Sequence, residues 1–364
     1  MPGNDGVQSH QFTEPEQVTT AQGGVFCQIV PAGPGPFEAA LHSISMGDVT
    51  LNMGRVSPCM ALLRTASDRA VLQLPLEGAE SLILNTVPYR PYMVGTYAGG
   101  ADLLRVGSRP TSFATLVLPS DAVETLLEPM AESRLLQPGG FALVQVPPST
   151  WDRAKRIITA ARAMASTMPD VFETEQPRFA LRDALLKAAH DLVSPKPDVK
   201  MCMPRSTQAR RRIVLRADDY IRTHLDRPIY SEELCNVLAV SASTLADAFQ
   251  AAFGISPHRY LKLRRLSMAR AALRPHEGRM PLVKSVALAH GFWHFGQFAH
   301  DYRATFGETP SDTLVRARGE LERAAKVRRA ADRAQLSRMS EQVRDAMGHA
   351  TPSGPASASA RTAS

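Results

Sequence analysis

Residues 231–254 read SEELCNVLAVSASTLADAFQAAFG, and residues 282–307 read LVKSVALAHGFWHFGQFAHDYRATFG. Each stretch predicts a short helix, a tight turn and a second helix that ends in Phe-Gly. Two amphipathic helices can close on each other because apolar residues recur at helical spacing on both sides of a corner. The repeat predicts two helix-turn-helix units, whose second helices, 242–253 and 294–306, would enter the major groove of DNA. In the first copy the apolar residues are Leu234, Leu238, Leu245, Phe249 and Phe253, and in the second Val286, Ala287, Phe292, Phe298, Tyr302 and Phe306.

The corner residues of the two copies differ. Ser241 precedes the second helix of the first copy, where its hydroxyl can accept a hydrogen bond from an otherwise unpaired backbone N–H. Gly291 stands at the corner of the second copy, where a residue free to take positive φ is useful. We interpret Trp293 as a packing residue of this corner rather than a base contact.

Several spaced elements around the repeat resemble the DNA-binding region of AraC/XylS-type transcriptional regulators. They are a connecting helix at 257–273, GISPHRYL at 254–261, RRL at 264–266, GFWH at 291–294 and FGETPS at 306–311. The resemblance implies an α+β, two-domain chain with a cupin-like N-terminal effector domain and an all-α, homeodomain-like double helix-turn-helix. It implies an effector-responsive activator of a catabolic or stress operon. The implied partners are double-stranded DNA, a small-molecule effector, RNA polymerase and a second copy in a homodimer.

Basic charge is concentrated in the C-terminal part of the chain. Up to Arg205 there are 17 Lys and Arg against 20 Asp and Glu, and from Ser206 onward there are 25 against 15. This asymmetry is expected if the C-terminal part lies on phosphates. No apolar run approaches the roughly 18 residues of a membrane span, and the first twenty residues lack the pattern of a signal peptide. We therefore expect a cytoplasmic protein with no membrane partner.

The N-terminal part alternates short β-branched or apolar runs with Gly and Pro. Many short strands at spacings near ten predict a sandwich or barrel, in agreement with the cupin-like domain that the resemblance implies. Two amphipathic helices follow, at 151–168 and 178–193, and the resemblance implies that they form the dimer. The predicted strands are 25–30, 41–44, 48–53, 59–63, 70–76, 81–84, 92–97, 111–118 and 141–144.

These patterns divide the chain into five segments. The expected segments are a disordered lead-in (1–22), a sensor domain with its dimerisation helices (23–193), a linker with three prolines (194–206), the DNA-binding domain (207–320) and a helical, then disordered tail (321–364). A helix at 210–225 should pack on the first helix-turn-helix unit.

The predicted DNA contacts lie opposite the apolar faces of the recognition helices. They are Ser243, Thr244, Asp247 and Gln250 on the first helix, and His294, Gln297, His300 and Arg303 on the second. Arg259, Lys262, Arg264 and Arg265 flank the first unit and are expected to attract the DNA backbone. Family members commonly carry a basic residue where this chain has Asp247, so the first unit is expected to contribute less.

Two other classes of function remain open. One is an enzyme, either a metal-dependent cupin or a DNA-repair protein with a methyl-acceptor cysteine. The other is a ligand-free architectural DNA-binding protein. A cupin metal site needs clustered histidines, yet only His10 and His42 precede Ala189, so we expect no enzyme, metal or cofactor. Arg55, Arg64 and Tyr92 are our candidates for an effector pocket.

Overall fold

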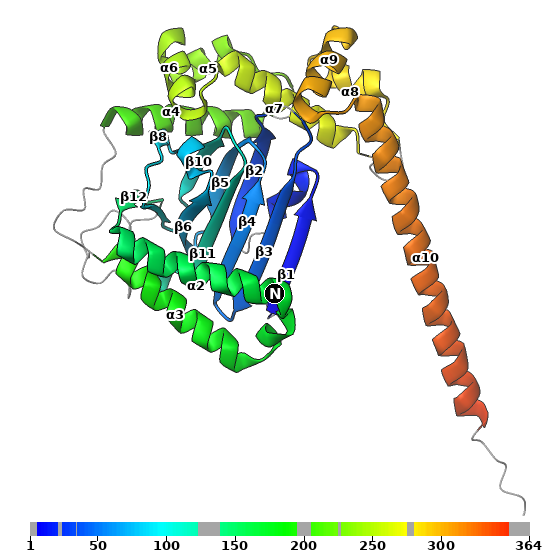
Figure 1. The fold of residues 1–364 in the computed structure, drawn as a ribbon. Helices are drawn as coiled ribbons and strands as arrows, with labels where there is room; N and C mark the ends of the chain where they lie inside the picture. The colour runs from blue at the N-terminus through cyan, green and yellow to red at the C-terminus, as the bar shows by residue number, and fades with distance from the viewer. Residues whose placement is uncertain are drawn as a thin grey trace, which may run out of the picture.

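The structure is a computed structural model, and it describes residues 6–20, 24–33, 35–122, 139–194, 205–224, 227–274 and 280–348. A sheet-rich N-terminal part lies beneath a layer of short helices, and one long helix projects away from the body (Figure 1). This arrangement confirms the predicted α+β class, with a β domain followed by an all-α region.

Seven antiparallel strands form the larger sheet. In order across the sheet they are β1 (Gly6–Phe12), β3 (Ala39–Met46), β4 (Val49–Val56), β11 (Thr111–Pro119), β6 (Arg69–Glu77), β9 (Met93–Tyr97) and β12 (Phe141–Gln145). The smaller sheet has the order β2 (Val25–Pro31), β5 (Cys59–Thr65), β10 (Asp102–Gly107), β7 (Leu82–Leu84) and β8 (Val87–Pro88). All nine predicted strands are present. Strands β8 and β10 were not predicted; β8 has only two residues, and Asp102 and Arg105 interrupt the apolar run of β10.

The predicted disordered lead-in is wrong for the residues that the structure describes there. Strand β1 pairs with β3 along its whole length, from Gly6 opposite Ser45 to Phe12 opposite Ala39. A short 3-10 helix, η1 (Pro15–Thr20), follows and buries Val18. Because β1 is an edge strand whose side chains are mostly exposed, backbone pairing holds it, and its sequence carries no hydrophobic signal.

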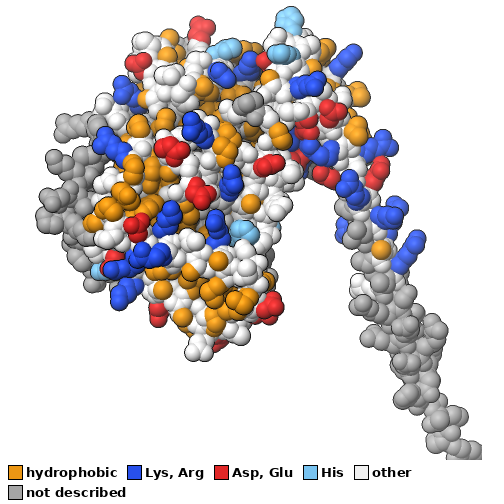
Figure 2. Space-filling view, viewed as in Figure 1, with side chains coloured by type: hydrophobic (Ala, Val, Ile, Leu, Met, Phe, Trp, Pro, Cys, Tyr) orange, Lys and Arg blue, Asp and Glu red, His pale blue; other side chains and the backbone are white. Residues whose placement is uncertain are grey.

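Two helices cover one face of the seven-stranded sheet (Figure 1). They are α2 (Pro148–Thr167), which buries Trp151 and Ile158, and α3 (Glu175–Val193), which buries Leu185 and Leu192. Both helices were predicted, with starts three residues later. Hydrophobic side chains also gather on the outside of this region (Figure 2), where Phe179 is 60% exposed.

Seven helices make up the described C-terminal region. They are α4 (Arg205–Thr223), α5 (Ser231–Leu238), α6 (Ala242–Phe253), α7 (Pro257–Ala272), α8 (Val283–Ala289), α9 (Phe295–Phe306) and α10 (Pro310–Gly348). Helix α10 runs through the predicted boundary at residue 320 without a break. Most of the predicted linker, and the predicted disorder at the end of the tail, lie outside the described residues. None of the described helices has the length and apolar character of a bilayer span.

An apolar seam joins the β domain to the first helix-turn-helix unit. Val30, Met60, Leu104 and Val106 of the five-stranded sheet belong to one buried cluster with residues of α4, α5, α6 and α7. A second connection is ionic. Glu14, which follows β1, is 3% exposed, and Arg316 of α10 donates a hydrogen bond of 2.8 Å to its carboxylate.

A buried polar cluster lies between α4 and α7, beside the first unit. Arg264 and Asp218 are 3% and 2% exposed, with 3.6 Å between Nη2 and Oδ1. The hydroxyl of Tyr260 donates to the same Oδ1 at 3.0 Å, and burial together with the Asp218 charge raises the pKa of Tyr260. Asp218 therefore balances a guanidinium that has almost no access to water.

We predict that Asp218→Ala lowers the free energy of unfolding by about 3–5 kcal/mol, because it leaves Arg264 buried without its carboxylate. Urea denaturation followed by circular dichroism measures the change. Asp247→Ala, which removes an exposed carboxylate from the neighbouring helix, should change it by less than about 0.5 kcal/mol. Equal losses in the two variants would contradict the role given to Asp218.

Candidate nucleic-acid interface

A left-handed residue and a capping serine form the turn between the two helices of the first helix-turn-helix unit. Helix α5 ends at Leu238, and the next residue, Ala239, adopts a left-handed conformation with φ of 53°. Ser241 then caps α6, as predicted, because its Oγ accepts a hydrogen bond of 3.1 Å from the backbone N–H of Thr244. Leu245 and Phe249 of α6 are fully buried, and this orients the helix with its polar face outward.

The corner of the second unit requires glycine. Gly291 has φ of 74°, and a Cβ at this position would lie 2.8 Å from the Cβ of Pro228. Helix α9 then buries Phe298, Tyr302 and Phe306, whose neighbouring rings lie 5.6 and 4.6 Å apart between centroids. The aromatic ladder fixes which side of α9 faces outward.

The recognition helices α6 and α9 lie at the same end of the molecule, remote from α2 and α3 (Figure 1). All eight residues predicted to contact DNA on these helices are exposed. They are Ser243, Thr244, Asp247 and Gln250 on the first helix, and His294, Gln297, His300 and Arg303 on the second. Each helix therefore offers a polar face with the side chains that can read base edges.

The two polar faces have different chemistry. On α6 the hydroxyl of Ser241 lies 2.9 Å from that of Ser243 and 2.8 Å from that of Thr244. The helix has no Lys or Arg, and Asp247 carries its one charge. On α9 the exposed face carries Arg303 and histidine side chains, so the second unit has the more favourable charge for DNA.

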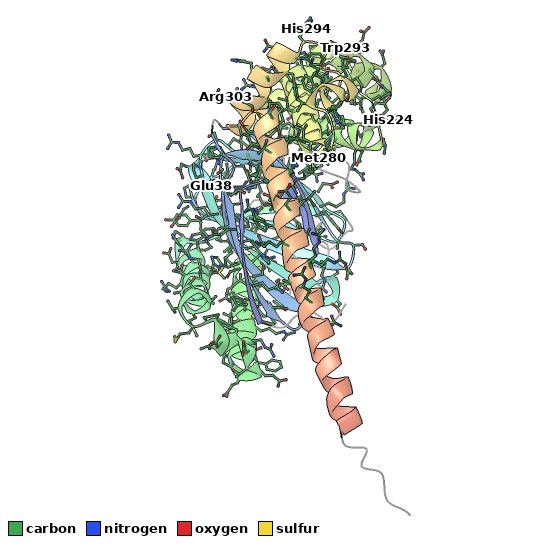
Figure 3. The ribbon with its side chains drawn as sticks, turned by 90° about the vertical axis from the view of Figure 1, so that its right-hand side faces the viewer. Glu38, His224, Met280, Trp293, His294 and Arg303 are labelled. Atoms are coloured by element: carbon green, nitrogen blue, oxygen red, sulfur yellow. The ribbon has the colours of Figure 1, made fainter. Side chains whose placement is uncertain are left out.

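Trp293 lies two residues before α9, where the sequence predicts a packing residue. The structure contradicts this, because its side chain is 71% exposed. Figure 3 shows Trp293 and His294 at the far end of the helical region, with Arg303 on the same unit. A large exposed aromatic beside a recognition helix is a candidate DNA contact that spacing alone missed.

The four cations expected to attract the DNA backbone have different surroundings. Arg259 is exposed. Lys262 pairs with Asp301 at 3.1 Å, and Arg264 is buried in the cluster described above. The guanidinium of Arg265 lies 5.7 and 5.2 Å from the ring centroids of Tyr230 and Phe292, and its burial lowers its pKa.

Three of these four cations thus make ion-pair or ring contacts within the domain. The expectation of direct backbone attraction fails for Arg264, which has almost no exposed surface. Arg259 retains the exposure that a phosphate contact requires.

The structure separates the three candidate effector-binding residues. Arg55 lines a cavity of about 50 Å³ between the two sheets. Arg64 instead lines a cleft between the β domain and the helices, where it pairs with Asp102 at 2.7 Å. Tyr92 is 37% exposed and lines neither space. Within the described ranges, no cluster of three or more His, Cys, Asp or Glu side chains could hold a metal ion.

Comparisons with known proteins find relatives of the C-terminal region. A family described as "Helix-turn-helix domain" matches residues 234–316. The "XylDLEGF operon transcriptional activator" of Pseudomonas putida is 35% identical over 106 residues, which cover 29% of this chain and 33% of the relative. The chain thus spans about a third of the length of this curated relative.

Two further similarities were found. The "Probable thc operon regulatory protein" of Rhodococcus erythropolis is 30% identical over 150 residues, covering 41% of this chain and 43% of the relative. A crystal structure of a probable AraC family transcriptional regulator from Rhodopseudomonas palustris is 39% identical. It covers 29% of this chain and 97% of its own, with a TM-score of 0.27.

We predict that Trp293→Ala weakens binding to a selected DNA site by about 1 kcal/mol or more, because apolar surface that DNA would cover is lost. Stability should change by less than about 0.5 kcal/mol, since the side chain packs on little of the protein. Fluorescence anisotropy and urea denaturation measure the two quantities. Phe26→Ala, at a 63% exposed aromatic of the β domain, is the control. A loss of stability with unchanged DNA affinity would restore the packing interpretation.

We predict that Asp247→Lys tightens DNA binding and steepens the slope of log affinity against log salt concentration by about 1, because one cation is added against the phosphates. Titrations at several salt concentrations measure the slope. Glu38→Lys makes the same charge change on the exposed surface of the β domain (Figure 3) and should leave the slope unchanged. The same slope in both variants would mean that α6 does not face the DNA.

Proposed function

We propose that this protein is a sequence-specific, DNA-binding transcriptional regulator of the AraC/XylS family, because residues 234–316 match a helix-turn-helix domain and the chain is similar to an operon transcriptional activator. One observation carries the proposal: two recognition helices expose polar faces at the same end of the molecule while burying their apolar faces in the domain. This is the arrangement that reads base edges in the major groove.

The two units engage successive major grooves on one face of the DNA. Helix α7 connects them, so each protomer covers about 20 base pairs, since successive grooves lie about 10 base pairs apart. Helix α9 supplies most of the sequence discrimination, because its face combines Gln297, His300 and Arg303. Helix α6 contributes less, owing to Asp247 and the absence of a cation.

The N-terminal domain receives a signal and forms the dimer. A small-molecule effector binds in the cavity between the sheets, which Arg55 lines. The exposed apolar surface of α2 and α3, with Phe179, supports their use as the contact between two copies (Figure 2). The names of the relatives, which describe an operon transcriptional activator and a probable operon regulatory protein, support a regulator that activates an operon. In this proposal the target is a catabolic or stress operon, and the protein acts through RNA polymerase in the cytoplasm.

The protonation of the buried thiols argues against a DNA-repair protein with a methyl-acceptor cysteine. Burial raises the pKa of Cys27 to about 12, and it also raises the pKa of Cys59. Both thiols therefore stay protonated near neutral pH, whereas a methyl acceptor needs thiolate character. Cys235 is partly exposed, and Cys202 lies outside the described residues.

The direct test is binding of the full-length protein to sheared genomic DNA, followed by sequencing of the bound fragments. A regulator gives a few sharp peaks, which Gln297→Ala should weaken. Diffuse, salt-sensitive binding that the substitution does not alter would refute sequence-specific regulation.

We predict that Gln297→Ala and His300→Ala each lose about 1–3 kcal/mol of discrimination at one base pair, because they remove a contact to a base edge. Arg259→Ala should instead weaken binding to all sequences alike, since a phosphate contact carries no sequence information. Affinities for every single-base variant of a selected site measure the difference. Uniform weakening in the first two variants would show that these residues do not read bases.

A further inference from the structure

Helix α7 contributes to two separate apolar clusters. Its N-terminal half places Tyr260 and Leu261 in the buried cluster of the first unit. Its C-terminal half places Leu266 and Ala269 in that of the second, and partly buried Leu263 packs against both. Figure 1 shows α7 between α5 and α6 on one side and α8 and α9 on the other. The angle between the two units therefore depends on what holds them against the middle of α7.

Arg265 lies at this midpoint and contacts both units. Its guanidinium carbon lies 5.7 Å from the ring centroid of Tyr230, the residue that precedes α5. It lies 5.2 Å from the ring centroid of Phe292, in the turn between α8 and α9. One side chain thus links an aromatic ring of the first unit to an aromatic ring of the second.

A close approach of the two backbones lies beside this side chain. Pro228, which precedes the first unit, packs on Gly291 so tightly that a Cβ on the glycine would lie 2.8 Å from the Cβ of the proline. The same Cβ would lie 3.3 Å from Nη1 of Arg265. We call the contact formed by Pro228, Tyr230, Arg265, Gly291 and Phe292 the α7 joint.

The chemistry of the α7 joint suits a fixed geometry. A guanidinium is planar, stays protonated in proteins and stacks on aromatic faces, and loss of water strengthens such a contact. Arg265 is partly buried, and burial lowers its pKa. Phe292 is 9% exposed and belongs to the apolar cluster of the second unit, so its ring cannot move without opening that cluster. Arg265 therefore connects a fixed ring of the second unit to the entry of the first.

We propose that Arg265 is a positioning residue, which links Tyr230 to Phe292 and so fixes the number of base pairs between the sequences that α6 and α9 read. Each base pair inserted between two such sequences moves the second by about 3.4 Å and turns it by about 35° around the duplex. A rigid connection between two binding units gives the highest effective concentration at the spacing that it matches. The inference rests on the proposed function, in which both recognition helices bind the same DNA.

The test measures the spacing preference of the full-length protein. Duplexes carry a selected site with one, two or three base pairs inserted or deleted between the parts that α6 and α9 read, and fluorescence anisotropy measures each affinity. The wild type should lose about 10-fold or more for one inserted base pair. Arg265→Met should bind the best spacing about 10-fold less tightly and lose less than about 3-fold on insertion, because a looser joint reaches other spacings more readily.

Arg259→Met and Arg265→Lys separate positioning from a phosphate contact. Arg259 is an exposed cation of the same helix, so its loss should lower the slope of log affinity against log salt concentration by about 1 and leave the spacing preference intact. Arg265→Met should relax the spacing preference and leave the salt slope at the best spacing unchanged. Arg265→Lys keeps the charge but loses the planar guanidinium, so it should relax the preference as well.

Tyr230→Ala tests the same link from the first unit. Tyr230 is 51% exposed, so this variant removes the ring contact without opening an apolar cluster. It should relax the spacing preference, and combining it with Arg265→Met should add little, because both substitutions remove one contact. Discrimination among single-base variants of the part read by α9 should persist in each variant, since the exposed face of α9 is unaltered.

Three results would overturn the inference. They are a wild type that is indifferent to spacing, an unchanged spacing preference in Tyr230→Ala, and an Arg265→Met variant that matches Arg259→Met in salt slope and spacing preference. If Arg265→Met does not fold, Tyr230→Ala decides. Sequencing of bound genomic fragments separates the two proposals: sharp peaks together with indifference to spacing refute the positioning role alone, whereas diffuse binding refutes the regulator on which it rests.

Discussion

The apolar seam between the five-stranded sheet and the first helix-turn-helix unit is the contact on which the arrangement of the molecule depends. Leu104 and Val106 of β10 share one buried cluster with Val214 of α4 and Phe249 of α6. Burial of apolar surface is the main favourable term in folding, and here it is continuous across the two parts of the chain. The seam therefore fixes where α6 lies relative to the β domain.

Buried arginines add specificity to this arrangement. Arg264 of α7 is balanced by Asp218 of α4, whereas buried Arg270 and the partly exposed Arg316 reach Glu14, a residue of the N-terminal segment. Removing one partner of such a pair costs more than the pair itself contributes, because the remaining charge is left buried without its counterion. Arg105 is the contrasting case, because its guanidinium lies over the ring of Phe113 at the cavity between the sheets.

The positive charge of the C-terminal part gives an incomplete picture of the DNA-binding surface. Arg264, Arg265 and Lys262 form part of the domain's internal ion pairs and ring contacts. The surface of the recognition helices depends instead on neutral polar side chains, histidines, Arg303 and the exposed Trp293. Counting charges along the sequence cannot separate these roles, because they depend on which side chains the fold buries.

The sequence by itself determined the two helix-turn-helix units, the strands with continuous apolar runs, the capping role of Ser241 and the exposed faces of the recognition helices. These features follow from local periodicity and from residues that act on their own neighbours in the chain. Only the tertiary structure revealed that polar β1 pairs with β3, that Trp293 is exposed, and that Arg55 and Arg105 meet at one cavity while Arg64 and Tyr92 lie elsewhere. Each of these features depends on contacts between strands or helices that are distant in sequence. A local sequence pattern does not specify which distant segment packs against a given strand or helix.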